Sequence, residues 1–143
     1  MLSHTTEKKE MTYAPIVMFA YNRPEHTRRT LQALAHNTLA RESGITIYSD
    51  APETELDAKS VGEVRGYLDT VTGFKTIRII KQSENQGLAK SIINGVTQAV
   101  KEYGKTIVIE DDMLTSPYFL TYMNKALNFY QGKVCDVSPY GTT

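Results

Sequence analysis

Short apolar runs alternate with longer segments of helical spacing along this chain. The runs 16–20, 45–48, 77–80 and 106–109 are brief and rich in β-branched residues, which is typical of strands buried on both faces. Strands that alternate with helices predict βαβ units with right-handed crossovers. The expected fold class is therefore α/β, a Rossmann-like three-layer α/β/α arrangement with a mainly parallel sheet.

Four helices are expected between and after these strands, each with an apolar face spaced three or four residues apart. The first begins at Pro24, ends near His36 and buries Leu31 and Leu34. The second follows Thr54 and Asp57, which have capping-box spacing, and buries Val61, Val64, Leu68 and Val71. In the third, Leu88, Ile92, Val96 and Val100 recur every four residues, Tyr103 follows, and Gly104 ends the helix. The fourth has Ser116 as N-cap and Pro117 at its first position, with Phe119, Met123, Ala126 and Tyr130 on one face. Val134–Tyr140 is expected to open a fifth strand.

The length, charge and cysteine content of the chain exclude several classes of function. The chain has 143 residues, the size of one domain, and 16 basic residues balance 16 acidic ones. A zero formal charge argues against a general nucleic-acid binder. The single Cys135 rules out an intrachain disulfide and favours a reduced, cytoplasmic setting. No apolar run is long enough to span a bilayer, and residues 1–13 are expected to form a disordered polar tail.

Polar side chains follow each of the four predicted strands. They are Asn22 and Arg23, then Asp50, then Glu84, Asn85 and Gly87, and finally Glu110, Asp111 and Asp112. The carboxyl ends of parallel strands meet at one edge of a sheet, where open α/β folds bind their ligands. We therefore expect a ligand site at this edge.

The acidic run is the sharpest of these features, because three adjacent carboxylates repel one another. A divalent cation would remove that repulsion, and Mg²⁺ and Mn²⁺ prefer carboxylate oxygens. The competing interpretation is that the run only caps a strand and solvates a loop. Asp50 could likewise form a turn before Pro52 or accept hydrogen bonds from a base or ribose. Arg23 and Lys90 could be surface cations or could hold a phosphate.

Several phosphate-binding and catalytic motifs are absent. The sequence has no G-x-x-x-x-G-K-[ST] loop, no G-x-G-x-x-G after the first strand and no G-x-S-x-G elbow. A carboxylate-bound metal together with an arginine is the remaining route by which this sequence could hold phosphates.

At this point the residues resemble a known family. The segment Ile107–Asp112, followed by Ser116–Phe119, resembles the metal-binding segment of GT-A glycosyltransferases, and is closest to the branch that includes N-acetylglucosaminyltransferase I. Pro15–Arg23 is similar to the opening strand of that fold, and Glu84–Ala89 to the Asn-x-Gly-x-x segment of bacterial inverting family-2-like members. The resemblance covers nearly the whole chain from Pro15 onward.

The resemblance implies a role for each matched position. Asp112, supported by Asp111, would ligate Mn²⁺ or Mg²⁺ on the diphosphate of a sugar nucleotide. Glu110 and Asp111 would contact ribose or sugar hydroxyls, Asp50 would accept from a uracil ring, and Arg23 would lie along the nucleotide. Ala20, Tyr21 and Asn22 would complete the donor site. The loop that contains Glu84, Asn85, Gly87 and Lys90 would close over the ribose and donor sugar.

The implied function is a glycosyltransferase that transfers a sugar from a UDP-sugar to an acceptor hydroxyl. Residues 14–143 would be its nucleotide-sugar-binding half, truncated before the acceptor half, with exposed sheet surface that favours self-association. The catalytic base is unknown, since Asp136 is the one acidic residue after Asp112. Two alternatives stay open: a Mg²⁺-binding receiver-type signalling domain, and a non-catalytic interaction domain on the same fold.

Overall fold

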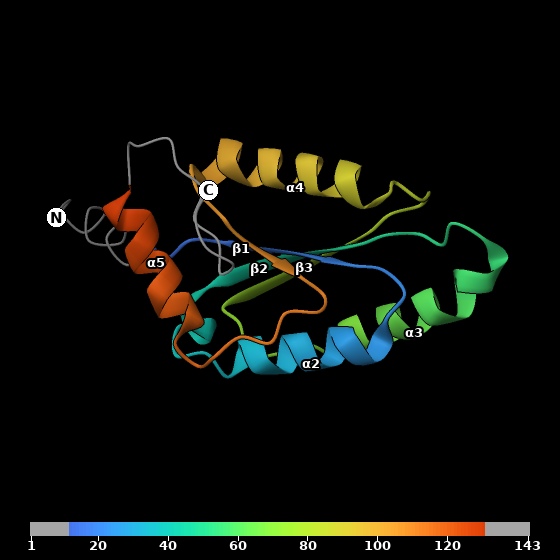
Figure 1. The fold of residues 1–143 in the computed structure, drawn as a ribbon, viewed down its shortest axis with the longest axis horizontal. Helices are drawn as coiled ribbons and strands as arrows, with labels where there is room; N and C mark the ends of the chain where they lie inside the picture. The colour runs from blue at the N-terminus through green and yellow to red at the C-terminus, as the bar shows by residue number, and fades with distance from the viewer. Residues whose placement is uncertain (1–11, 131–143) are drawn as a thin grey trace, which may run out of the picture.

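The computed structural model describes residues 12–130, in which four strands alternate with helices (Figure 1). The strands are β1 (Ile16–Ala20), β2 (Gly44–Ser49), β3 (Thr76–Lys81) and β4 (Ile107–Glu110). The helices are α2 (Pro24–Ala35), α3 (Ala58–Leu68), α4 (Leu88–Tyr103) and α5 (Phe119–Phe129), with 3₁₀ turns η1 (Ala40–Glu42) and η2 (Glu55–Asp57). All four expected strands and all four expected helices are confirmed. The tail at 1–11, Cys135, Asp136 and the expected fifth strand lie outside the described residues.

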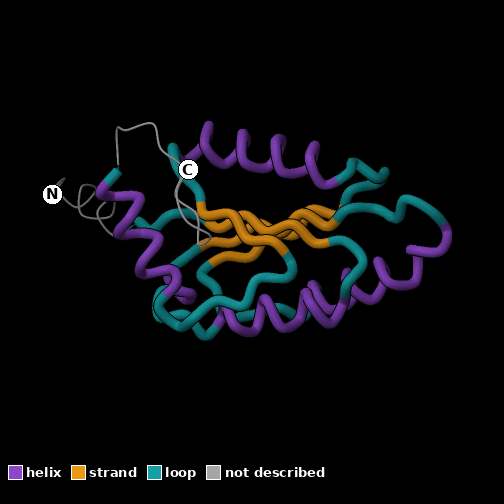
Figure 2. The backbone as a smooth tube through the Cα atoms, viewed as in Figure 1, coloured by secondary structure: helices purple, strands orange, loops and turns teal. Residues whose placement is uncertain are grey.

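The four strands form one parallel sheet in the order β3-β2-β1-β4. The chain first moves outward from β1 through β2 to β3, and then returns across the sheet to place β4 on the other side of β1. The direction of winding therefore reverses between β1 and β4. Helices α2 and α3 cover one face of the sheet and α4 covers the other (Figures 1 and 2), which confirms the three-layer α/β/α fold. The order is that of the first four strands of the dinucleotide-binding fold, and differs from the flavodoxin-like order of receiver domains.

The two faces of the sheet have cores of different size. On the side of α2, α3 and α5, buried apolar side chains from all of these helices and from three strands make one continuous cluster. It includes Met18, Ile47 and Ile109 from the strands and Leu34 and Leu120 from the helices. On the side of α4, the buried cluster is only Val17, Phe19 and Ala99, with partly buried neighbours around it.

Helix α4 packs on the sheet through small residues, which corrects the expected apolar face. Its buried residues are Ser91, Gly95 and Ala99, whereas Leu88 and Val100 are 58% and 44% exposed. The reason is the aromatic pair beneath the helix: Phe19 and Tyr48 stack with ring centroids 5.5 Å apart. A Cβ atom at Gly95 would lie only 2.9 Å from the Phe19 ring. Only a small side chain therefore fits at the closest approach.

Two predicted caps were wrong. Helix α5 begins at Phe119, because Ser116 and Pro117 form the turn before it and the Ser116 carbonyl accepts from the Phe119 N–H. The face that α5 buries is Phe119, Leu120, Met123 and Asn124, without Ala126 and Tyr130. Thr54 makes no side-chain cap, and η2 lies between it and α3. The carboxylate of Asp57 accepts hydrogen bonds from Tyr21 and Asn22 instead.

Candidate active site

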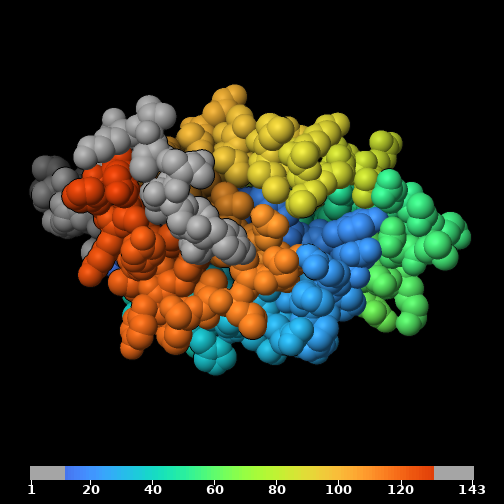
Figure 3. Space-filling model, viewed as in Figure 1, coloured from blue at the N-terminus to red at the C-terminus, as the bar shows by residue number. Residues whose placement is uncertain are grey.

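A cavity of about 370 Å³ lies at the carboxyl edge of the sheet. Its wall comes from the ends of β1, β2 and β4, from the loop before α4, and from the first turn of α4 itself. The lining residues are Phe19, Ala20, Tyr21, Asn22, Arg23, Tyr48, Asp50, Glu53, Asn85, Gly87, Leu88, Ser91, Glu110 and Asp111. In Figure 3 the blue segment that follows β1 lies between yellow α4 and the orange segment that follows β4. The cavity is thus next to the reversal point of the sheet, where doubly wound folds bind ligands.

The register of the strands gives the cavity two chemically different ends. Phe19 of β1 is paired with Glu110 of β4 on one side and with Tyr48 of β2 on the other. A single row across the sheet therefore runs from a carboxylate through two aromatic rings. Adjacent strands are about 4.8 Å apart, so the acidic end and the aromatic end are separated by roughly 10 Å, the width of a small ligand.

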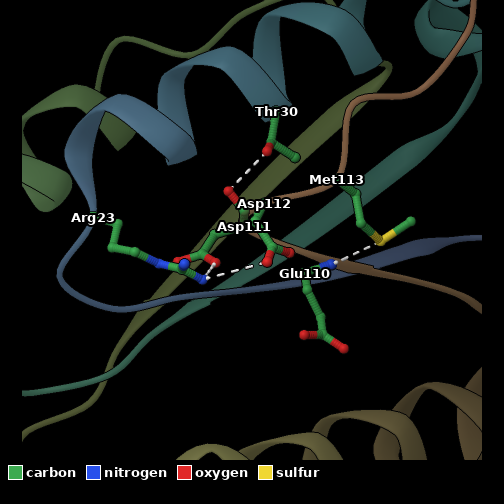
Figure 4. Close-up of polar contacts among 6 residues, drawn as sticks. All are labelled: Arg23, Thr30, Glu110, Asp111, Asp112 and Met113. Atoms are coloured by element: carbon green, nitrogen blue, oxygen red, sulfur yellow. Dashed lines mark hydrogen bonds and ion pairs between the residues drawn. The ribbon is translucent and has the colours of Figure 1, made fainter.

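At the acidic end, Arg23 is the counterion of Asp111. The Arg23 Nη2 atom donates to Asp111 Oδ1 at 2.5 Å, and Asp111 is buried. The Asp111 carbonyl accepts from Thr30 Oγ1 of α2 at 2.8 Å. These contacts fix the strand end on the α2 side of the sheet (Figure 4). Part of the expected repulsion in the acidic run is thus relieved by an arginine of the protein.

The other two carboxylates of the run are free to meet a ligand. The Glu110 side chain extends away from Asp111 and towards α4 (Figure 4). Asp112 is half exposed, and its closest cation is Arg23 Nη2 at 3.8 Å, beyond hydrogen-bond distance. Within residues 12–130, no group of three or more His, Cys, Asp or Glu side chains could hold a metal ion. Mg²⁺ is commonly held by one or two carboxylates together with water and substrate phosphates.

At the opposite end, Asp50 organises the loop between β3 and α4. Its Oδ1 atom accepts from the backbone N–H groups of Ala51 at 2.9 Å and Gln86 at 2.8 Å. Its Oδ2 atom accepts from the Gly87 N–H at 2.9 Å and from Asn85 Nδ2 at 3.4 Å. Gly87 has φ +83°, a conformation that favours glycine. With four protein donors already in place, Asp50 holds the start of α4 against the end of β2.

Tyr21 and Asn22 are held by Asp57, at the start of α3. The Tyr21 hydroxyl donates to Asp57 Oδ2 at 2.8 Å, and Asn22 Nδ2 donates to Asp57 Oδ1 at 2.9 Å. The hydrogen bonds from Asn22 and then Tyr21 lower the pKa of Asp57. Burial raises the pKa of Tyr21, so its hydroxyl keeps its proton. The loop after β1 is thereby anchored with its backbone along the cavity wall.

The structure brings most of the predicted site residues together. Those in the wall are Ala20, Tyr21, Asn22, Arg23, Asp50, Asn85, Gly87, Glu110 and Asp111. Glu84, Lys90 and Asp112 are exposed and are not among the lining residues. Sequence reasoning missed Phe19, Tyr48, Glu53, Leu88 and Ser91. Of these, Phe19 and Tyr48 could have been found. Phe19 is one residue before the end of the predicted strand 16–20, and Tyr48 is the last residue of the predicted strand 45–48, so both rings are close to the ligand edge.

Two solved structures have a fold similar to that of this chain. TarS from S. aureus superposes with a TM-score of 0.57 and 15% sequence identity over 88% of this chain. The mannosyltransferase PcManGT from Pyrobaculum calidifontis, solved in complex with GDP-Man and Mn²⁺, superposes with a TM-score of 0.55 and 16% identity over 87% of this chain. The fold is glycosyltransferase-like. At these identities the likeness concerns the fold alone.

The chain spans a minor part of both neighbours. It covers 21% of the TarS chain and 35% of the PcManGT chain. The sequence matches no family model and no curated protein. Within the described residues, no helix is long and apolar enough to cross a membrane.

Proposed function

We propose that this chain is the donor-binding portion of a metal-dependent glycosyltransferase that takes a nucleotide-diphospho-sugar, with a UDP-sugar favoured. The observation that carries the proposal is the cavity at the reversal point of the sheet, with a carboxylate and arginine end and an aromatic end. A sugar nucleotide has the matching chemistry, because a charged diphosphate lies between an uncharged nucleoside and an uncharged sugar. The mannosyltransferase neighbour, solved with GDP-Man and Mn²⁺, supports the same ligand class.

The distribution of charge suggests an orientation for the ligand. Arg23 is 45% exposed, and beyond its contacts with Asp111 and Asp112 its guanidinium has no partner in residues 12–130. Its free N–H groups could donate to phosphate oxygens in fork geometry. The nucleoside would then lie towards Tyr48, Asn85 and Gly87, where an aromatic ring and amide groups suit a flat base with polar edges.

Asp112 is the proposed metal ligand, with Asp111 as its support. Its carboxylate is half exposed, and its ion pair with Arg23 Nη2 is long, at 3.8 Å. Mg²⁺ and Mn²⁺ are held in such sites by one or two carboxylates together with substrate phosphates, so the donor set fits. When bound, the ion would supply charge neutralisation to the departing nucleoside diphosphate. The protein's part is to position the diphosphate with Arg23 and to keep Asp111 paired.

We propose that residues 14–143 belong to a nucleotide-sugar-binding domain. In an inverting transfer to an acceptor alcohol, a separate general base removes the proton of the acceptor hydroxyl.

Calorimetric titration with UDP, and in parallel with GDP, tests the proposal, each with Mn²⁺ and again with EDTA. We expect UDP binding that requires Mn²⁺ and is lost in Asp112→Ala. Glu102→Ala is the matched control, because it removes an exposed carboxylate on α4 outside the cavity. If folded protein binds neither nucleotide, the donor site does not exist and the interaction-domain interpretation takes its place. Binding that is equal with EDTA would remove the metal from the proposal.

A further inference from the structure

Ser91 has a buried hydroxyl with no partner. The residue is 6% exposed, and its Oγ atom makes no hydrogen bond within residues 12–130. Thr27 is the other described residue with such an orphaned side-chain oxygen, but only Ser91 lines the cavity. Most buried polar side chains have a partner, because an unsatisfied one destabilises the folded state. An orphaned hydroxyl in a ligand cavity therefore calls for a ligand.

The position of Ser91 indicates which part of a ligand its hydroxyl would bind. Ser91 is one turn before Gly95, which touches the rings of Phe19 and Tyr48. It thus lies on the helix that covers these two rings, one turn nearer to the start of α4, and it lines the cavity there. A serine hydroxyl both donates and accepts, and turns about a single torsion. It suits an uncharged polar edge better than a phosphate, for which the cavity already offers Arg23.

We propose that Ser91 Oγ is a hydrogen-bonding group for the nucleoside end of the ligand and contributes to selection of that end. The inference rests on the proposed function and deepens it, because it names a contact that neither the acidic run nor Asp50 provides. Asp50 has all its acceptor positions occupied by protein donors. Ser91 Oγ is a buried, cavity-lining oxygen without a hydrogen-bond partner in residues 12–130.

The test compares two ligands and two readouts in Ser91→Ala. With Mn²⁺ present, we expect UDP affinity to fall about three- to tenfold, as for the loss of one neutral hydrogen bond. The affinity for inorganic pyrophosphate, which reports on the charged end alone, should change less than twofold. The melting temperature of the ligand-free variant should be unchanged or higher, since the substitution removes an unsatisfied group from the interior of the fold.

Thr97→Ala is the matched control, because it removes an exposed hydroxyl from the same helix and should leave UDP binding as in the wild type. Equal losses for UDP and pyrophosphate would overturn the inference in favour of a phosphate contact. Unchanged UDP affinity, or a lower melting temperature of the ligand-free variant, would show a structural role instead. Wild-type protein that binds no nucleotide would overturn the proposed function and this inference together, whereas the other outcomes leave the proposed function intact.

Discussion

Replacing Gly95 by alanine should destabilise this protein, although alanine favours helices. In a helix interior the exchange of glycine for alanine alone stabilises by about 0.5–1 kcal/mol. At Gly95, however, the new Cβ would lie 2.9 Å from two atoms of the Phe19 ring and 3.0 Å from Tyr48. Phe19 is 4% exposed and stacked on Tyr48, so the ring has little room to retreat.

The magnitude follows from setting these two effects against each other. Overpacking of a buried site destabilises by about 1–3 kcal/mol, so the net loss for Gly95→Ala is roughly 0–2.5 kcal/mol. Gly62 on α3 provides the control, because a Cβ there meets nothing within 4 Å. Gly62→Ala should stabilise by about 0.5–1 kcal/mol. The two variants should therefore differ by about 1–3 kcal/mol, or on the order of 3–10 °C in melting temperature for a chain of this size.

Urea unfolding followed by circular dichroism measures both variants under the same conditions. Equal midpoints for Gly95→Ala and Gly62→Ala would refute the reasoning, since they would mean that α4 stands further from the sheet than the Phe19 contact requires. A second consequence concerns the cavity, because Phe19 is part of its wall. Displacement of that ring should weaken nucleotide binding in Gly95→Ala and leave it unchanged in Gly62→Ala.

Two further predictions concern the loops that surround the cavity. The pKa of Asp57 is lowered by Asn22. This carboxylate therefore stabilises the fold above its ordinary pKa of 3.8, and it loses that contribution as the pH falls through its lower folded pKa. A carbon-detected NMR titration should show a higher pKa of Asp57 in Asn22→Ala, and an unchanged pKa would contradict the assignment. Asp50→Ala should lower the free energy of unfolding by roughly 2–4 kcal/mol, because the N–H donors lose a charged acceptor. Hydrogen exchange at the Gly87 amide should then be faster than in the wild type. Protection equal to that of the wild type would show that other contacts hold the loop.

The sequence predicts correctly those features that depend on one helix or strand alone. The run at 16–20 and the helix from Leu88 to Tyr103 have the predicted bounds, because β-branched runs and a terminal glycine act locally. The buried face of α4 was mispredicted, since the large apolar side chains of that helix flank the contact and small ones form it. Which helix residues touch the sheet depends on the rings below them, and no spacing rule contains that information.

The candidate site divides in the same way. The location of the site at the carboxyl edge of the sheet follows from the alternation of strands and helices along the sequence. The polar residues after each strand could therefore be named in advance. The pairing of Arg23 with Asp111, 88 positions apart, and of Asp50 with the loop at 85–87 could not, because each depends on distances between elements. Ser91 was missed for the same reason: its importance is the absence of a partner, which only packing reveals.

The unequal cores on the two faces of the sheet have a consequence for motion. In residues 12–130, the buried apolar cluster between α4 and the sheet consists of Val17 and Phe19 of β1 and Ala99 of α4 itself, so this helix shares few apolar contacts with the rest of the described fold. Segments with few such contacts open in partial unfolding at a lower free energy than the whole domain. We therefore expect α4 to behave as a separate cooperative unit. Because α4 forms one wall of the cavity, a ligand there would bind only the closed population, and its affinity would include the equilibrium for ordering the helix.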